Sequence, residues 1–548
     1  MSIKAQFATH AVQNQPLPLP PVTLWTSDAC LREAVQRHGG AWAQAQLHAH
    51  GELAGGPMME LGELANRNRP VLRAFDRHGR RIDAVEFHPA YHELMQHAMR
   101  SEVHSFSWRH GDQRGAHVAR AALMYVNTQP DAGIACPLTM THAAVPALRQ
   151  AGAHAEPWLR LVTAADYDPR TLPAAQKIAC TLGMGMTEKQ GGSDVRSNTT
   201  RAIAQPGGSY ELVGHKFFFS APMSDAHLVL AQSDAGLSCF LLPRVLPDGQ
   251  LNAVRIQRLK DKLGDWSNAS AEVEFQGATA YLVGPEGRGV PTIIEMVALT
   301  RLDCMLGSAA LMRQALVQAV HHARQRQAFG RLLIDQPLMA NVLADLALDS
   351  EAAVRLCMRV AQAVDQAPGD AHEAAIVRLA TAIGKYWICK RTPAFVNEAQ
   401  ECLGGIGYVE ENILPRLYRQ APLNSIWEGS GNIQCLDVLR ALQKEPGVRE
   451  ALFRELAVAR GTDPHYDRSV DWLASAFDDT ANLESRSRLL VERTALTLQA
   501  ALLLSAGNGD VSHAFCVARL GDARGIAYGT LAAQTPMSRV IERAVPVF

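Results

Sequence analysis

The 548-residue chain has no excess charge of either sign, because 53 Lys and Arg stand against 54 Asp and Glu. A nearly neutral chain has no overall field that attracts a polyanion, so a nucleic-acid site has to be a local patch. The ten cysteines never form a CxxC pair. Their scatter argues against a zinc site and against a disulfide framework. We therefore expect no metal and a reducing, cytoplasmic location.

The sequence also lacks a long hydrophobic run and a common nucleotide motif. The N-terminus has no apolar signal segment, and the longest uncharged helical run, residues 494–509, contains Thr, Gln and Ser. Because a membrane span needs about 20 apolar residues, we expect a core helix there and no membrane association. There is no GxxxxGK[ST] run, and neither Gly183-Met184-Gly185 nor Gly405-Ile406-Gly407 has a third glycine at the required offset. A P-loop is therefore excluded, and a dinucleotide-binding fold is disfavoured.

The hydrophobic pattern changes along the chain. Prolines in the first 25 residues favour an extended arm. Short β-rich runs, in which Ala271–Phe275 alternates apolar and acidic residues, predict a small, mostly antiparallel β domain. Beyond Gly289, apolar residues recur every three or four positions, and we expect this first bundle helix to end at Phe329-Gly330. The fold class is therefore mainly α with a small central β domain. The predicted parts are an extended N-terminal arm (1–27), an N-terminal helical domain (28–181), the β domain (182–290), an antiparallel helical bundle (291–440) and a C-terminal helical domain (441–548).

Two runs in the β region have residues suited to a ligand. Residues 186–194 contain paired glycines, which let backbone N–H groups approach an anion, and the hydroxyls of Thr187 and Ser193 can donate to a ring carbonyl or a phosphate. The alternative is a polar surface turn. Three adjacent phenylalanines, residues 217–219, cannot all face one side of a strand, so at least one stacks on something or is exposed. Simple core packing is the alternative there.

Two further runs lie in and after the bundle. Glu428 stands between Trp427 and a Gly-Ser-Gly turn, where desolvation would raise its pKa toward that of a general base. A helix cap or a solvated side chain is the alternative. Arg326 follows a helical run and can reach a phosphate, or it can simply complement the helix dipole. The tail, residues 441–548, has twelve basic and thirteen acidic residues, and eleven of the twelve are Arg.

Arginine binds phosphate well because its planar fork donates bidentately. We therefore name Arg440, Arg519 and Arg524 as candidates for contact with double-stranded DNA. The alternative is that they are ordinary solvated arginines.

These four runs, in this order, resemble the acyl-CoA dehydrogenase flavoprotein family over about residues 40–440. The similarity extends over nearly the whole chain, including the Pro-rich arm and the extra tail, to the branch of that family linked to the bacterial adaptive response to DNA alkylation. The matching segments are the Thr-Glu and Gly-Ser-Asp run (187–194), the Lys-to-Ser run (216–220), Arg-x-x-Phe-Gly (326–330) and aromatic-Glu-Gly-Ser (427–430).

The resemblance implies that FAD binds between the β domain and the bundle of a homotetramer, with Arg326 reaching a neighbouring subunit's flavin. It implies that Glu428 is the base that removes the α proton of an acyl-CoA thioester, while Arg301 has a supporting role. Phe218 stands where the family has Trp, and Ser220 and Ser430 replace Thr, which keeps the hydroxyls. The FAD-contacting residues that it implies are Met184, Gly185, Met186, Thr187, Gly192, Ser193, Phe218, Ser220, Arg326, Phe329, Trp427, Gly429, Ser430 and Asn432.

Two functions follow from these observations. The first is a DNA-associated flavoprotein of the alkylation response that binds duplex DNA with little sequence preference and oxidises acyl-CoA weakly, because Trp427 and the phenylalanines narrow the acyl pocket. The second is a genuine dehydrogenase of a short or branched acyl-CoA, with an electron-transferring flavoprotein as its acceptor and a tail that serves assembly or a protein partner. The neutral tail favours the second function, and the near-complete resemblance favours the first.

Overall fold

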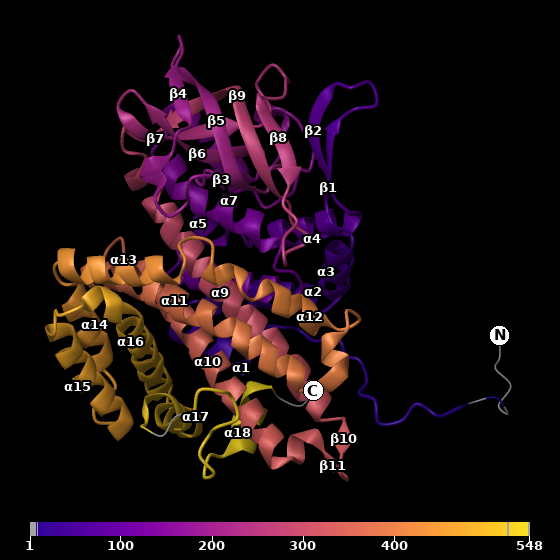
Figure 1. Cartoon of the computed structure of the whole chain (residues 1–548), viewed down its shortest axis with the longest axis vertical. Coiled ribbons are helices and arrows are strands. Elements are labelled where there is room, and N and C mark those ends of the chain that lie inside the picture. Colours follow the sequence, from indigo (N-terminus) through magenta and orange to yellow (C-terminus); the bar gives the residue numbers. More distant parts are fainter. Residues whose placement is uncertain (1–6, 8, 523–524, 546–548) are drawn as a thin grey trace.

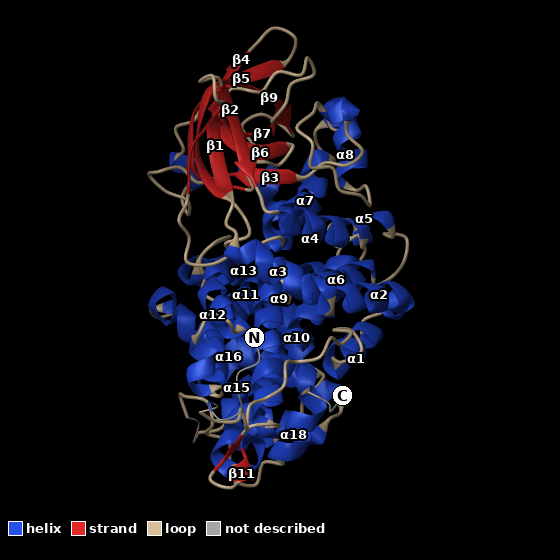
Figure 2. Cartoon of the chain, turned by 90° about the vertical axis from the view of Figure 1, so that its right-hand side faces the viewer, coloured by secondary structure: helices blue, strands red, loops and turns tan. Residues whose placement is uncertain are grey.

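A computed structural model describes residues 7, 9–522 and 525–545. The β domain lies at one end of the long axis, the bundle and the tail lie at the other, and helices of the N-terminal part lie between them (Figures 1 and 2). This arrangement agrees with the predicted fold class, and it places the β domain next to one end of the bundle.

The N-terminal part is mostly helical, as predicted, but it also contains a hairpin that the helical prediction missed. Strands β1 (Val71–Phe75) and β2 (Arg81–Glu86) pair antiparallel. The Asp76 carboxylate accepts from the backbone N–H groups of His78 and Arg80, and Gly79 has a φ of 79°, which together fix the turn. The helices are α1 (Ala29–Arg37), α2 (Gln44–Gly55), α3 (Pro57–Arg67), α4 (Pro89–Arg100), α5 (Phe106–Arg109), α6 (Ala116–Thr128), α7 (Ala135–Leu148) and α8 (Glu156–Val162).

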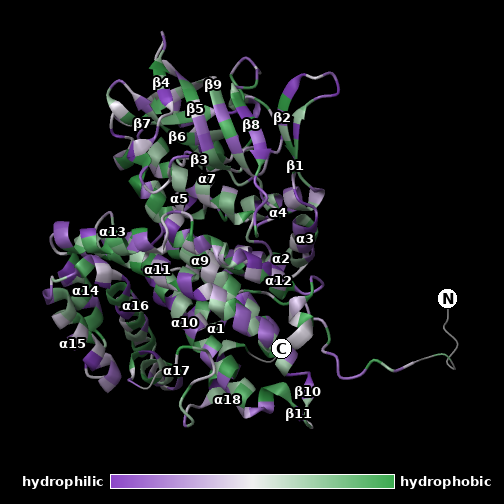
Figure 3. Cartoon of the chain, viewed as in Figure 1, coloured by the Kyte–Doolittle hydropathy of each residue, from purple (hydrophilic) through white to green (hydrophobic). Residues whose placement is uncertain are grey.

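The β domain is a seven-stranded sheet in the order β3-β6-β4-β5-β9-β7, with β8 paired to β9. Strand β7 also pairs with β6, which closes the sheet on itself. All pairs are antiparallel except β3–β6 and β4–β6, which confirms the mostly antiparallel prediction. Hydrophobic and hydrophilic segments alternate along β5, β8 and β9 (Figure 3). The strands are β3 (Leu182–Gly185), β4 (Arg201–Ala204), β5 (Ser209–Ser220), β6 (Ala226–Ser233), β7 (Gly236–Pro243), β8 (Val254–Leu259) and β9 (Ser270–Val283).

The bundle is built from three long antiparallel helices and two shorter ones. The first long helix ends at Ala323 and not at Phe329-Gly330, so that prediction was wrong. Phe329 and Gly330 have positive φ values of 51° and 77° and form the turn between strands β10 (Gln327–Ala328) and β11 (Arg331–Leu332). The helices are α9 (Gly289–Ala323), α10 (Pro337–Gln366), α11 (Ala371–Glu401), α12 (Ile413–Gln420) and α13 (Gly431–Lys444).

The tail shares one hydrophobic core with the bundle. Among the described helices, one is long and apolar enough, by length and composition, to cross a membrane: α16. Its buried side chains belong to the core, where α16 contacts α10, α11 and α15, in agreement with the predicted core helix. The tail helices are α14 (Val448–Ala457), α15 (Pro464–Asp478), α16 (Leu483–Ala506), α17 (Gly509–Phe515) and α18 (Met537–Ala544).

The N-terminal arm is extended and mostly exposed over residues 9–21. It runs along the far end of α9, where the Asn14 side chain donates to the Gln327 carbonyl oxygen at 2.9 Å and the Leu17 N–H donates to Gln325 Oε1 at 2.8 Å. The arm therefore covers the region between α9 and β10 of its own chain.

Candidate functional site

The turn that carries Glu428 is strained and leads directly into α13. Glu428 has a φ of 56°, in the left-handed region that non-glycine residues rarely adopt. Gly429 follows with a φ of 90°, and a Cβ there would lie 2.6 Å from Gln434 Nε2, so this position requires glycine. Ser430 then precedes Gly431, the first residue of α13. The Gly-Ser-Gly sequence thus explains how the chain turns sharply at the glutamate.

Side chains from three helices hold the backbone of this turn. Lys385 on α11 donates to the carbonyl oxygens of Trp427 and Gly429. Gln434 Nε2 on α13 donates to the Glu428 carbonyl oxygen at 3.1 Å, and Arg301 Nε on α9 donates to the same oxygen at 3.2 Å. These hydrogen bonds offset the free-energy cost of the strained backbone, and they fix the position of the Glu428 backbone from which the side chain extends.

The Glu428 carboxyl group has the environment expected of a base. Desolvation raises its pKa above the ordinary value, against the opposing effects of a Thr300 hydrogen bond and of the Lys385 and Arg301 charges. Thr300 Oγ1 donates to Oε2 at 2.8 Å. Arg301 makes its ion pair elsewhere, with Asp437 at 2.7 Å, so it supports the turn and does not neutralise the carboxylate directly.

The three adjacent phenylalanines separate as the strand geometry requires. Phe219 is 1% exposed and belongs to the β-domain core, whereas Phe218 is 49% exposed. The Lys260 ammonium lies 3.3 Å from the centre of the Phe217 ring and 4.5 Å from that of Phe218. An aromatic face on a strand, open to contact, is what a flavin ring needs for stacking.

A buried ion pair that the sequence reasoning missed fixes the glycine-rich loop. Lys216 Nζ on β5 lies 2.8 Å from Glu188 Oε1, and both side chains are fully buried. Glu188 also accepts from the backbone N–H groups of Thr199 and Thr200 at 2.7 and 3.2 Å. The pair therefore ties the loop to β5. The signal for it was present, because both residues lie inside the two motifs that drew attention to this region.

The loop presents hydroxyl groups that are open to a ligand. Among the described residues, the hydroxyls of Thr187 and Ser193 have no hydrogen-bond partner, and Ser193 is exposed. Gly192 has no room for a side chain, because a Cβ there would lie 2.8 Å from Thr187 Oγ1. Ser220, at the end of β5, lies 3.3 Å from Ser270 through their hydroxyls. These groups can donate to a bound polar molecule.

Residues of both halves of the site pack against one apolar cluster. Met184 and Met186, at the end of β3, and Trp427 all pack against it. Its buried members include Cys136 of α7 and Leu299 of α9, one residue before Thr300. The loop after β3 and Trp427, beside Glu428, thus both contact this cluster, with Gly185 between the two methionines. Trp427 is held there by a 2.9 Å hydrogen bond from Nε1 to Asn424.

Two predicted residues, Arg326 and Phe329, lie away from the Glu428 turn within one chain. Arg326 is 26 residues beyond Thr300, past the end of α9, which corresponds to about 40 Å along a helix axis. It donates to the Asn14 carbonyl oxygen of the arm, and the nearby Phe329 is fully exposed. Asn432, in contrast, lies in the first turn of α13 directly after the Glu428 turn, where it is exposed and accepts from Arg488 Nε at 2.9 Å.

Two of the three arginines that were predicted to contact DNA lie among the described residues. Arg519 is 9% exposed and makes ion pairs with Asp345 and Asp349 of α10, so its assignment as a DNA contact was wrong. A guanidinium held by two buried carboxylates cannot reach a phosphate. Arg440 is exposed on α13, as a DNA contact requires. Arg524 lies outside the described residues.

Other predictions concerned metals and cysteines. All ten cysteines are free and buried, in agreement with the prediction of no disulfide framework. In the part of the chain that the structure describes, no group of three or more His, Cys, Asp or Glu side chains is arranged to hold a metal ion.

Three family descriptions match successive parts of the chain. The N-terminal domain of the adaptive response protein AidB matches residues 14–169, the middle domain of acyl-CoA dehydrogenase matches 183–278, and its C-terminal domain matches 287–443. The chain is 50% identical over 519 residues to the putative acyl-CoA dehydrogenase AidB of Escherichia coli, covering 94% of this chain and 95% of that one.

More distant relatives have the same architecture. Acyl-CoA dehydrogenase family member 11 of Caenorhabditis elegans is 30% identical over 86% of this chain and 78% of its own. The crystal structure of C. elegans ACDH-11 in complex with C11-CoA superposes with a TM-score of 0.84 at 26% identity, covering 96% of each chain. With its dehydrogenase middle and C-terminal domains and its AidB-type N-terminal domain, this chain belongs to the acyl-CoA dehydrogenase family.

Proposed function

We propose that this chain is a cytoplasmic, FAD-containing flavoprotein of the DNA alkylation response that has kept the base of an acyl-CoA dehydrogenase and oxidises acyl-CoA only weakly. The observation that carries the catalytic part is the desolvated Glu428 carboxyl group, which accepts a hydrogen bond from Thr300. The full-length similarity to E. coli AidB supports the cellular role.

The residues present fit FAD, the cofactor of the family. Phe218 offers an exposed ring for stacking, and the Thr187 and Ser193 hydroxyls offer donors without partners among the described residues. Met184, Met186 and Trp427 would supply apolar walls. When bound, FAD supplies an acceptor for the hydride that leaves from the β carbon of an acyl group.

The chain's own part of the reaction is proton removal at the α carbon. An α C–H is a weak acid, so the base must be free of competing water and correctly placed. Desolvation raises the pKa of Glu428, which makes its carboxylate a stronger base, while the Thr300 hydroxyl orients it. Lys385, Gln434 and Arg301 hold the turn, so that the carboxylate does not swing away when it takes the proton.

We expect weak turnover of acyl-CoA because the large Trp427 side chain lies next to the base, Glu428. Trp427 is fixed by Asn424 and packs against the same cluster as Met184 and Met186. A large, immobile side chain next to Glu428 narrows the room for an acyl chain. The second candidate function, a genuine dehydrogenase of a short or branched acyl-CoA, requires rapid reaction with one such ester and an acceptor such as an electron-transferring flavoprotein. The C11-CoA complex of the related ACDH-11 supports an acyl-CoA as the class of ligand, with an acyl chain longer than the short one of this candidate.

We also infer a homotetramer, in which Arg326 of one subunit contacts the flavin of a neighbour. Its position beyond the end of α9, far from the Glu428 turn of the same chain, supports this proposal. Removal of the Arg326 charge should therefore weaken FAD binding without changing the environment of Glu428.

DNA binding by this chain should involve Arg440. It is exposed on α13, and Lys444, one helical turn further on, is exposed too. Binding to a duplex should weaken steeply between about 50 and 200 mM salt, because phosphate contacts release counterions. Replacement of Arg440 by Gln should weaken binding alike for unrelated sequences and reduce the salt slope by about one. Fluorescence anisotropy with labelled duplexes measures both quantities.

The matched control for this experiment is Arg449→Gln. Arg449 is paired with Asp478 at 2.7 Å, so its loss should change DNA affinity little. A flat salt response, or unchanged binding by the Arg440→Gln variant, would show that Arg440 is not part of a DNA site.

A further inference from the structure

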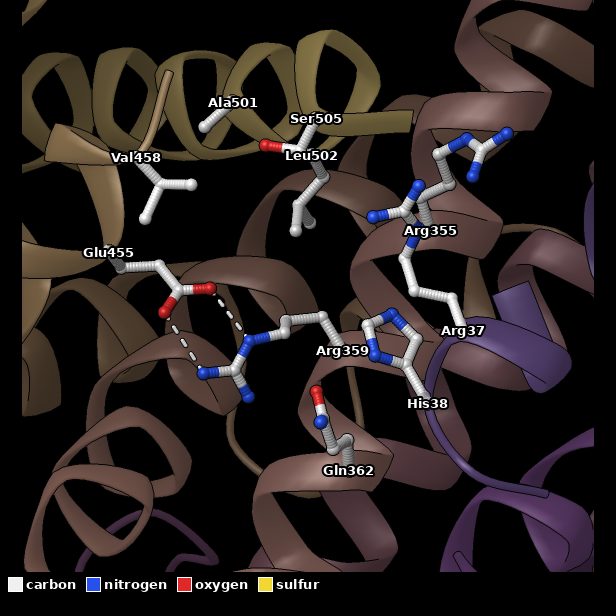
Figure 4. A pocket seen from close by; sticks show the side chains of 10 residues that line it. All are labelled: Arg37, His38, Arg355, Arg359, Gln362, Glu455, Val458, Ala501, Leu502 and Ser505. Atoms are coloured by element: carbon white, nitrogen blue, oxygen red, sulfur yellow. Dashed lines mark hydrogen bonds and ion pairs between the residues drawn. The ribbon is translucent and has the colours of Figure 1, made fainter. Parts of the chain in front are cut away.

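A cavity of about 240 Å³ lies where the tail packs onto the rest of the chain, and no residue of the Glu428 turn lines it. Its walls come from α1, α10, the end of α14 and the last turns of α16 (Figure 4). One wall is cationic and polar, with Arg37, His38 and Gln362. The opposite wall is apolar, with Leu502 and Val458, and Val458 is 74% exposed at the rim.

Most cations at this cavity are already neutralised. Arg359 on α10 donates to both Glu373 and Glu455, and Figure 4 shows the second of these pairs along one side of the cavity. Arg355 is held by Glu33 and Glu351. These ion pairs explain why arginines can line a partly buried space. They also leave the Arg355 and Arg359 guanidinium groups few free N–H donors for a ligand.

Arg37 differs from the other two arginines. It lies in the last turn of α1 and is exposed, and among the described residues it has neither a hydrogen bond nor an ion pair. Figure 4 shows its side chain extending from α1 toward Arg355. The imidazole of His38 lies next to Arg37. Burial lowers the pKa of His38 to about 4, and the charges of Arg359 and Arg37 lower it in the same direction. His38 is therefore neutral at pH 7 and can hydrogen-bond without adding charge.

We propose that this cavity binds a small organic anion, in which an oxyanion pairs with Arg37 and a short apolar group lies against Leu502 and Val458. An oxyanion matches the fork of a guanidinium that lacks an intramolecular partner. The exposed Val458 and half-buried Leu502 are apolar surface that such a ligand would remove from water. This site is separate from the Glu428 turn and does not depend on the proposed dehydrogenase or DNA functions.

Hexanoate is a suitable probe, because it combines a carboxylate with a short alkyl chain. Isothermal titration of the full-length, FAD-loaded protein should detect its binding, and hexanoate should raise the Tm relative to sodium chloride of equal ionic strength. The Arg37→Gln variant should weaken binding at least about tenfold, as expected for loss of a hydrogen-bonded charge. The Arg37→Lys variant should fall between that variant and the wild type.

Arg32→Gln is the matched control, because Arg32 is exposed on the same helix and does not line the cavity. It should bind hexanoate like the wild type. Hexan-1-ol, which lacks the charge, and inorganic phosphate, which lacks the alkyl chain, should both bind more weakly than hexanoate. Equal hexanoate affinity in the wild type and the Arg37→Gln variant would overturn the proposal, as would hexan-1-ol or phosphate binding as tightly as hexanoate.

Discussion

Substitution of Glu428 by Gln should abolish the anaerobic bleaching of the flavin spectrum by acyl-CoA esters while leaving FAD bound. Removal of a general base costs about 100- to 10,000-fold in rate. The amide keeps the size of the side chain and can still accept from Thr300, so the turn should stay in place. The measurement is stopped-flow absorbance with a panel of acyl-CoA esters.

The Glu411→Gln variant is the control, because Glu411 is exposed and is not among the residues assigned to the site. Bleaching by the Glu428→Gln variant at the wild-type rate would show that another group removes the proton. Slow bleaching of the wild-type flavin by every ester would favour the alkylation-response proposal. Rapid bleaching with one ester, lost in the variant, would favour the genuine dehydrogenase.

We also expect the stability of the Glu428→Gln variant to differ from that of the wild type in a pH-dependent way. The pKa of Glu428 is raised in the folded state, so the native protein holds this proton more tightly than the unfolded chain does. The wild type therefore loses stability as pH rises from the unfolded pKa, near 4.3, through the raised folded pKa. Glu428→Gln removes this loss, so the variant should have a higher Tm than the wild type at pH 7 and a similar Tm at pH 4.

Substitution of Lys216 by Met should lower the free energy of unfolding by about 3–5 kcal/mol, the usual cost of leaving one charge of a buried pair without its partner. The variant should also lose FAD more readily, since Glu188 would no longer tie the glycine-rich loop to β5. Urea unfolding followed by tryptophan and flavin fluorescence measures both effects. Lys189→Met, an exposed change in the same loop, should stay within about 0.5 kcal/mol of the wild type.

A double variant, Lys216→Met with Glu188→Gln, tests whether the charge is the cause. The amide can still accept from Thr199 but is neutral, so the double variant should be more stable than Lys216→Met alone. If both variants are equally unstable, the loss comes from packing and not from the unpaired carboxylate.

Low pH should weaken the stabilisation that comes from the Lys216–Glu188 pair. Burial alone would raise the pKa of Glu188, but the Lys216 charge and hydrogen bonds from Thr200 and Thr199 outweigh it and lower the pKa to about 2. The stability that this carboxylate contributes is therefore present above the unfolded pKa, near 4.3, and is lost as pH falls toward 2. The Glu188→Gln variant should lack this part of the acid sensitivity.

Features encoded by neighbouring residues could be predicted from the sequence. The alternating run Ala271–Phe275 lies within β9, because alternation of side chains directly reflects which face is buried. The Glu428 turn could be predicted because Gly429 supplies the required positive φ next to the base. The hairpin at β1 and β2 was missed because it is short and lies among helices, where periodicity gives little signal.

By itself, the amino-acid sequence determined the mainly α fold with its central β domain, the family, and Glu428 as the candidate base, because these depend on local patterns and on their order along the chain. Only the tertiary structure decided which charges find partners. Arg519 meets Asp349, which lies 170 residues earlier, and Lys216 meets Glu188. The composition of the tail could not distinguish a solvent-exposed arginine such as Arg449 from a buried one such as Arg519, because charge pairing depends on which helices pack together.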